Sequence, residues 1–164
     1  MKTDRILGQE VRNYLIEKGV ETPIKERKLN ETEKIELIRD NMEVVIDVLG
    51  LDREDDSIGG TADRVAKMYV KELCSGLSYN RFPKISVFDN KMNYSSMVIQ
   101  KDITFHSLCE HHFVNFNGMA QVAYIPNGKV IGLSKLNRVV NFFARRPQVQ
   151  ERLNEQIYFA LQYV

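Results

Sequence analysis

Residues 95–108, SSMVIQKDITFHSL, alternate apolar and polar side chains and are rich in β-branched residues, which is the pattern of a half-buried strand. Residues 85–90 (ISVFDN) and 119–126 (MAQVAYIP) follow the same alternation. The steps FNG at 116–118 and PNG at 126–128 are typical turn sequences. The middle of the chain is therefore predicted to form an antiparallel meander.

Helical periodicity flanks these strands on the N-terminal side. Three helices are predicted there, over residues 3–18, 30–50 and 61–77. Asn30 and Thr61 are the expected N-caps of the second and third helix, because their short polar side chains can accept from free backbone amides.

On the C-terminal side the period returns to helical from Ser134, which is the expected N-cap. The apolar face of this helix comprises Leu136, Val139, Val140 and Phe143. Pro147 is expected in the first turn of a last helix. Its apolar positions recur every four residues, at Val149, Leu153, Ile157 and Leu161. The fold class is therefore α+β, with N-terminal helices followed by an antiparallel sheet and two helices packed on one face.

Composition and charge indicate which classes of protein and ligand fit this chain. The 164 residues suffice for one domain with a sizeable core, and no apolar run approaches the length of a membrane span. Because the N-terminus has no signal-peptide pattern, a cytoplasmic location without membrane contact is expected. Residues 1–60 carry 10 Lys/Arg against 15 Asp/Glu, and residues 61–164 carry 13 against 7. This modest basic excess favours a small anionic ligand over nucleic acid.

The stretch SLCEHHF at 107–113 is the strongest chemical signal. All three histidines of the chain lie at 106–112, and Cys109-x-x-His112 can hold one metal ion if the backbone turns between them. A buried thiol beside a hydrogen-bonded histidine is the structural alternative. His111 projects differently from its neighbour, so it could be an acid–base group rather than a ligand.

Basic residues form two further candidates. Ser134, Lys135 and Arg138 begin a predicted helix, and backbone amides with two cations there could bind phosphate. Arg64 and Lys67 lie three positions apart on one face of an earlier helix. Taken alone, the first segment is explained equally well by a solvated basic face, and the second is explained better by one, because exposed lysines at helical spacing are common.

The stretch RRPQVQERL at 145–153 places Gln150 and Glu151 beside the junction of the last two helices. A carboxylate can accept two hydrogen bonds from a guanidinium group or from N1–H and the exocyclic amine of guanine. Taken alone, Glu151 is better explained as a surface residue with Arg145, Arg146 and Arg152 nearby.

In this order and spacing, SLCEHHF, VAYIPNGKVIGLSKLNRVV and FFARRPQVQERL resemble GTP cyclohydrolase I. The resemblance runs from about Thr61 to the last residue. It implies the tunnelling fold, or T-fold, and a homodecamer of two face-to-face pentamers with active sites at subunit boundaries. It also implies hydrolytic opening of the GTP purine ring at C8, formate release and formation of 7,8-dihydroneopterin triphosphate, which feeds folate, pterin or 7-deazaguanine synthesis.

The resemblance assigns roles to individual residues. It implies a zinc ion held by Cys109 and His112, with His111 as an acid–base group near purine N7. The triphosphate residues match Ser134, Lys135 and Arg138, and Ser134 is also expected at the catalytic centre. Glu151 is expected to anchor guanine, with Gln150 beside it as a further catalytic residue. Arg64 and Lys67 are expected to reach the phosphates of a neighbouring subunit.

One feature departs from the family pattern. The family's third zinc ligand lies in a later H-x-C segment, and this sequence does not contain that segment. Residues 61–164 are therefore expected to be a catalytic domain that is incomplete at its C-terminus. Residues 1–60, which precede the resemblance, are expected to be an N-terminal helical region. The alternative function is a catalytically incomplete homologue that binds nucleotide or assembles with full-length subunits. A 7-deazaguanine nitrile reductase of the same fold fits less well, because CEHH and QVQER are cyclohydrolase motifs.

Overall fold

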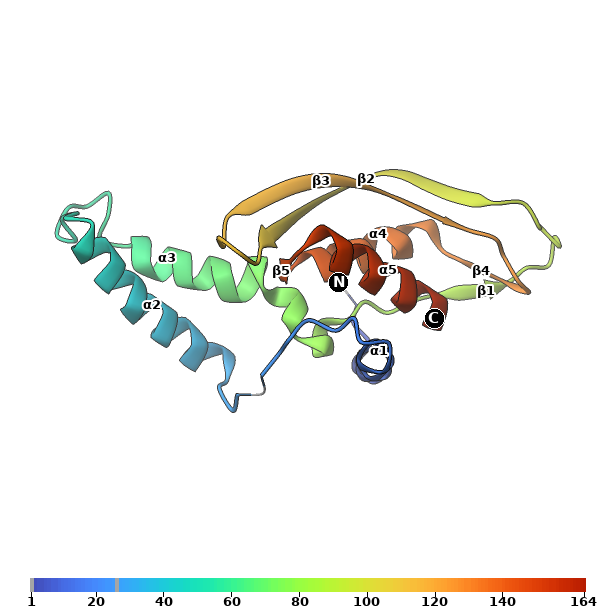
Figure 1. Ribbon diagram of the computed structural model, residues 1–164, viewed down its shortest axis with the longest axis horizontal. Helices are drawn as coiled ribbons and strands as arrows, with labels where there is room; N and C mark the ends of the chain where they lie inside the picture. Colours follow the sequence, from blue (N-terminus) through green and yellow to red (C-terminus); the bar gives the residue numbers. More distant parts are fainter. Residues whose placement is uncertain (1, 26) are drawn as a thin grey trace. The chain divides into compact units, whose positions relative to one another are not determined.

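The computed structural model describes residues 2–25 and 27–164 (Figure 1). These residues form two compact units, one made of residues 1–24 with 76–164 and the other of residues 25–75. The helices and strands confirm the predicted α+β class. In the described part of the chain, no helix has both the length and the apolar character that crossing a membrane requires.

The unit of residues 25–75 is helical. Its helices are α2 (Glu31–Val48), α3 (Thr61–Met68) and the π-helical η1 (Tyr69–Leu73), followed by the 3-10 turn η2 (Ser75–Leu77) at the unit boundary. The cap prediction at Asn30 is confirmed: its side chain accepts from the Glu33 amide at 3.0 Å, and Glu33 accepts in return from the Asn30 amide at 2.7 Å.

The predictions for the third helix were partly wrong. Gly60 is the N-cap of α3, and Thr61 is its first helical residue. The Thr61 hydroxyl instead accepts from the Arg64 guanidinium at 2.9 Å, so it is engaged by a side chain one turn further on. The α-helix also ends at Met68 rather than continuing to residue 77, because the hydrogen bonding changes to the π pattern.

The other unit contains a long antiparallel hairpin of β2 (Val98–Cys109) and β3 (Asn115–Tyr124). The short β5 (Pro147–Gln148) extends this sheet in parallel beside β2. A separate antiparallel pair joins β1 (Val87–Asp89) to β4 (Lys129–Ile131). The predicted antiparallel pairing is confirmed for β2 with β3. The predicted meander is wrong for β1, which pairs with β4 in a separate sheet and not with β2, and neither β4 nor the parallel β5 was predicted.

One turn prediction was correct and the other was wrong. The PNG step lies between β3 and β4, and Gly128 adopts the left-handed φ of 72° there. The FNG step lies inside β3, where Gly118 faces Phe105 across the hairpin. A Cβ atom on Gly118 would come within 2.5 Å of the Phe105 ring, so this glycine admits an aromatic ring rather than making a turn.

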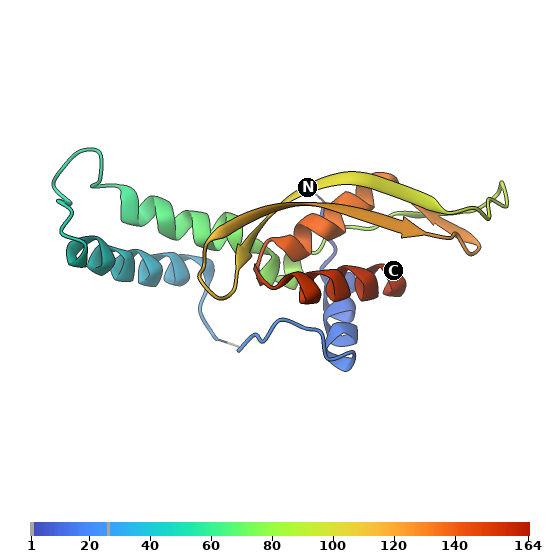
Figure 2. The same cartoon turned by 45° about the horizontal axis from the view of Figure 1, so that its top comes forward.

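Helices α4 (Leu133–Ala144) and α5 (Gln150–Tyr163) lie on the same face of the β2–β3 hairpin, and Figure 2 shows the hairpin arching over both. The predicted apolar face of α4 is confirmed, since its four members Leu136, Val139, Val140 and Phe143 are buried. Two cap assignments were wrong. Gly132, not Ser134, is the N-cap of α4, and Pro147 belongs to β5 and precedes the first turn of α5.

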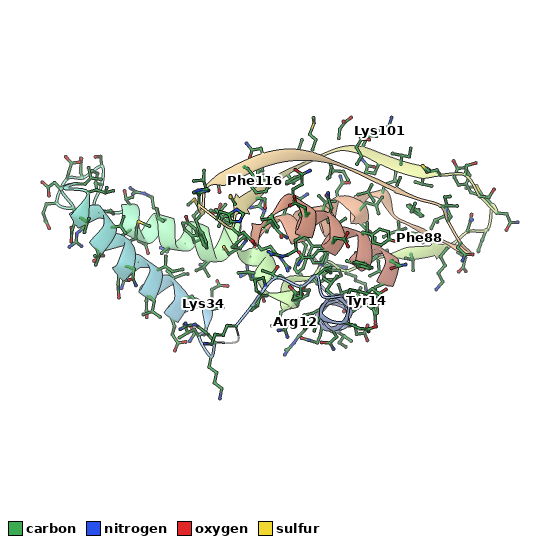
Figure 3. The ribbon with its side chains drawn as sticks, in the orientation of Figure 1. Arg12, Tyr14, Lys34, Phe88, Lys101 and Phe116 are labelled. Atoms are coloured by element: carbon green, nitrogen blue, oxygen red, sulfur yellow. The ribbon has the colours of Figure 1, made fainter. Side chains whose placement is uncertain are left out.

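The remaining helices of this unit are α1 (Arg5–Glu17) and the 3-10 turn η3 (Tyr79–Arg81). Helix α1 packs on α5 through Tyr14, whose ring lies 5.2 Å from that of Tyr163 and whose hydroxyl donates to Gln162 at 3.2 Å (Figure 3). Aromatic rings of this kind contribute area and orientation to the core. The chain after α1 is thereby held beside the C-terminal helix.

A candidate active site at the β2–β3 turn

The turn between β2 and β3 carries the cysteine and the two adjacent histidines. Its ends are closed by two backbone hydrogen bonds, from the Cys109 amide to Val114 O and from the Phe113 amide to Cys109 O, both 2.9 Å. Phe113 adopts the left-handed φ of 55°, which is uncommon for an aromatic residue. Unusual backbone of this kind often occurs at functional sites, where neighbouring structure holds it.

The turn favours the thiolate form of Cys109. Backbone N–H groups of His112 and His111 donate to the sulfur and lower the pKa of the Cys109 thiol, and the His111 side chain adds to this effect. A deprotonated thiol is the form of cysteine that binds metal. The turn predicted between Cys109 and His112 is present, at residues 110–112.

The two histidines of the turn present their rings differently. Their ring centroids lie 6.4 Å apart with planes inclined at 68°, and both residues are exposed. A thiolate and an imidazole three positions apart fit the donor set of zinc. Across residues 2–25 and 27–164, no group of three or more His, Cys, Asp or Glu side chains is close enough to hold a metal ion.

His106, the third histidine, is not part of this turn. It lies on β2, and its Nδ1 is 2.6 Å from Asn117 Oδ1 across the hairpin. This contact gives the side chain a structural role in the strand pairing. The histidine cluster seen in the sequence is thus divided between a strand and a turn.

The structure brings the QVQER segment beside the turn. Cys109 pairs with Gln148 in the parallel β2–β5 ladder, and the Glu110 amide donates to Gln148 O at 3.2 Å. Gln150 and Glu151 follow directly as the exposed first residues of α5. The turn and the start of α5 therefore form one local surface, as the candidate site requires.

Two further charged residues form an ion pair between the β2–β3 turn and the start of α5. The Arg152 guanidinium pairs with the Glu110 carboxylate, and both side chains are mostly buried. The sequence did not assign a role to either residue. Both are direct neighbours of predicted site residues, Glu110 of Cys109 and His111, and Arg152 of Glu151. The available signal was the position of Glu110 between Cys109 and His111.

The residues predicted to bind phosphate lie at the N-terminal end of α4, whereas β5 and its pairing with Cys109 follow the C-terminal end of this helix. Ser134 is exposed, and Lys135 and Arg138 are half-buried and three positions apart on one face of the helix start. Among the described residues no side chain caps this helix, whose N-cap is a glycine. From Ser134 to the last residue of α4 is about 15 Å at the α-helical rise, and the Cys109 turn lies beyond that end.

Arg64 and Lys67 belong to the helical unit of residues 25–75. The Arg64 guanidinium donates to Ser57 O at 3.2 Å and to the Thr61 hydroxyl at 2.9 Å. Lys67 forms an ion pair with Asp63 at 2.6 Å, one helical turn earlier. Both side chains are exposed and have partners within their own helix or the preceding loop.

A groove of about 1120 Å³ runs along β3 and α5. Its lining is mostly apolar, and Gln150 is the only predicted site residue among those that line it. Cys109, His111 and Glu151 do not line this groove. The groove is therefore adjacent to the candidate site without containing its chemistry.

Comparison with known proteins identifies the family of this chain. The sequence pattern of the GTP cyclohydrolase I family matches residues 38–164. GTP cyclohydrolase 1 of Aeromonas salmonicida (strain A449) and that of Aliivibrio fischeri (strain MJ11) are each 55% identical to this chain over 152 residues. The same identity holds for the Vibrio cholerae protein of that name, and each alignment covers 93% of this chain and 70% of the relative. The chain therefore belongs to the GTP cyclohydrolase I family.

Proposed function

We propose that this chain acts as a GTP cyclohydrolase, opening the purine ring of GTP at C8 with release of formate and formation of 7,8-dihydroneopterin triphosphate. Conversion of GTP to dihydroneopterin triphosphate is the reaction of the family. The observation that carries the proposal is the pairing of Cys109 with Gln148, which puts the turn with Cys109, His111 and His112 beside Glu151.

Cys109 and His112 are the residues that would hold zinc, which supplies the Lewis acidity that makes water a nucleophile near neutral pH. The backbone amides that donate to the Cys109 sulfur support this role, because they favour the thiolate. His111, whose ring plane is inclined at 68° to that of His112, is proposed to hold or transfer the proton at purine N7.

Glu151 is proposed to select guanine by accepting from N1–H and the exocyclic amine. Its exposure at the first turn of α5 leaves the carboxylate accessible, and the positive end of the helix dipole stabilises its charge. Gln150 is proposed to contribute a further amide beside the reacting ring. Both residues are held near the turn by the β2–β5 pairing.

Ser134, Lys135 and Arg138 are proposed to bind the triphosphate at the uncapped start of α4. This helix start and the Cys109 turn lie towards opposite ends of α4, whose length from Ser134 is about 15 Å. The separation supports a site shared between copies of the chain, as in the proposed decamer of two pentamers. Arg64 and Lys67 are proposed to reach phosphates within that assembly.

The finer fold assignment is also a proposal. The β2–β3 hairpin with α4 and α5 on one face is compatible with the T-fold. On this basis residues 1–60 would be an N-terminal helical region and residues 61–164 would carry the catalytic residues. A cytoplasmic location remains a prediction from the sequence.

The deciding experiment is formation of dihydroneopterin triphosphate from GTP by the purified chain supplied with Zn²⁺, followed by fluorescence of the oxidised pterin. Cys109→Ser is expected to abolish product, whereas Cys74→Ser is the matched control and should retain it. Equal turnover in both variants would overturn the role of Cys109. GTP binding by a folded parent without product would favour the alternative of a nucleotide-binding, catalytically incomplete homologue.

A further inference from the structure

Behind the candidate site lies a set of polar side chains that the proposed chemistry does not use. They are all largely or fully shielded from solvent and connect through hydrogen bonds. This buried polar network comprises Glu21, Thr22, Tyr79, Arg146, Gln148 and Gln156. Buried polar groups are costly unless they are paired, so a connected set of six invites a functional explanation.

Arg146 is the charged centre of the network and has no solvent exposure. Its Nη1 lies 3.2 Å from Glu21 Oε1 and 3.4 Å from the Thr22 hydroxyl, and its Nη2 donates to Gly76 O. The guanidinium carbon is also 5.1 Å from the Tyr79 ring centroid. The Tyr79 hydroxyl donates in turn to the Glu21 carboxylate, so the charge is enclosed on several sides.

Gln156 and Gln148 form a relay from the segment after α1 to β5. Gln156 Nε2 donates to Val20 O at 2.9 Å and to the Thr22 hydroxyl at 3.1 Å. Gln156 Oε1 accepts from Gln148 Nε2 at 2.8 Å, and the same amide of Gln148 donates to Phe143 O at 2.8 Å. Both amide hydrogens of each glutamine are thereby used, which fixes the orientation of both side chains.

The relay ends at the candidate site. Gln148 is the residue that pairs with Cys109 in the sheet, and its carbonyl accepts from the Glu110 amide. A second link joins the Ser107 hydroxyl to Arg146 O at 3.4 Å. The end of β2, from which the turn begins, is therefore attached to the buried polar network at Arg146, directly before β5, and at Gln148 within it.

We propose that the buried polar network is a positioning device for the site, through which Glu21 and Thr22 hold β5 in place and thereby set the turn of Cys109 against the start of α5. The inference rests on the proposed function of that turn. It assigns a role to residues that precede the 38–164 segment matched by the family pattern. Glu21 and Thr22 act through Arg146 and Gln156 and do not contact the reacting atoms.

Stability alone is a weaker explanation for this arrangement. A buried ion pair can often be replaced by apolar side chains of similar volume without loss of stability, because desolvation opposes the charge attraction. A connected set of directional bonds, by contrast, restricts its members to few arrangements. Among the described residues, only Arg146 Nε and Gln148 Oε1 of this network are buried without a hydrogen-bond partner. Restriction to few arrangements suits a segment whose displacement would separate the metal ligands from the guanine carboxylate.

Thr22→Val tests the proposal without removing a charge, since it deletes only the hydroxyl shared by Arg146 and Gln156. Thr22→Ser keeps a hydroxyl at this position and is the conservative control. Val11→Ala is the control for stability, because Val11 is fully buried on α1 and apolar. Two readouts are used: Co²⁺ binding by the full chain, followed by the thiolate absorption band, and amide hydrogen exchange of residues 108–113.

Thr22→Val is expected to weaken Co²⁺ binding about tenfold and to accelerate exchange in residues 108–113. Thr22→Ser should match the parent in both, and Val11→Ala should lower the melting temperature without either change. Unchanged exchange at 108–113 in Thr22→Val, or an equal change in Val11→Ala, would overturn the positioning role. A folded parent that binds no Co²⁺ would contradict the proposed metal site, and hydrogen exchange would then decide the inference alone.

Discussion

Glu110 and Arg152 form an ion pair that joins the β2–β3 turn to the first turn of α5. Arg152 Nη1 donates to one carboxylate oxygen, and Nη2 lies 3.4 Å from the other. Each partner is the direct neighbour of a predicted site residue, Cys109 or His111 on one side and Glu151 on the other. The charge pair therefore sets the spacing between the predicted metal ligands and the predicted guanine carboxylate.

This ion pair should contribute measurable coupling energy. Its side chains are only 22% and 25% exposed, so solvent screens them less than a surface pair. A double-mutant cycle of Glu110→Gln and Arg152→Gln, measured by urea unfolding, is expected to give about 1 kcal/mol. The exposed Arg39–Asp40 pair is the control and should give a smaller coupling energy, because solvent screens it more strongly. Equal coupling in the two cycles would show that the turn is not anchored in this way.

Substitution of Glu151 should remove the preference for guanine. Glu151→Gln replaces an acceptor of two hydrogen bonds by a group that presents a donor to the purine edge, and hydrogen bonds to a charged group contribute about 1.5–3 kcal/mol each. GTP binding is expected to weaken at least about tenfold, with little change for ATP, as measured by calorimetry. Glu155→Gln, one turn further along α5 and also exposed, is the matched control. A retained preference for GTP over ATP in Glu151→Gln would refute the assignment.

Substitution of Lys135 should affect the triphosphate but not the base. Removing one cation beside the uncapped start of α4 is expected to weaken GTP binding about tenfold, through loss of a charge-assisted hydrogen bond, while guanosine binding stays the same. Lys101→Ala removes an exposed lysine from β2, labelled in Figure 3, and should leave both affinities unchanged. The prediction fails if Lys135→Ala weakens GTP and guanosine equally.

The elements that sequence patterns predicted correctly depend on near neighbours. The alternation around residues 98–109 and the four buried positions of α4 each follow from one face meeting the core. The capping box of α2 needs only Asn30 and Glu33, three positions apart. Such features can be inferred because the deciding partners are within one turn or one strand.

The features that the sequence did not predict depend on partners distant in the chain. Arg146 follows Arg145 and resembles a surface residue, yet it is buried because Glu21 and Tyr79 meet it from other segments. Gly118 was predicted to lie in a turn, whereas it accommodates the ring of Phe105 on the opposite strand, a partner that the local sequence does not show. One usable signal was Gln156, a polar residue on the apolar face of α5.

Candidate site residues divide in the same way. Cys109 and His112 were recognisable from local spacing, and the turn between them is present. Their proximity to Gln150 and Glu151 depends on the parallel pairing of β2 with β5, which is only two residues long and begins with a proline. No periodicity is detectable over two residues, so this pairing was accessible only from the fold.

Alkaline pH should destabilise the chain through Cys74. Burial raises the pKa of this thiol from its ordinary value of 9.0 to about 11. Because the folded state holds the proton more tightly than the unfolded state, the stabilisation is fully present below pH 9 and is lost as the pH rises towards 11. A shift of this size corresponds to about 2 kcal/mol of unfolding free energy after allowance for partial exposure.

Urea unfolding of the parent and of Cys74→Ala, measured from pH 8 to pH 11, isolates this contribution. Burial also raises the pKa of Tyr79, but that residue is common to both proteins and cancels in the difference. The parent should lose about 2 kcal/mol more than Cys74→Ala across this range, with most of the difference arising above pH 9. A constant difference between the two proteins from pH 8 to pH 11 would mean that the Cys74 thiol titrates normally in the folded chain.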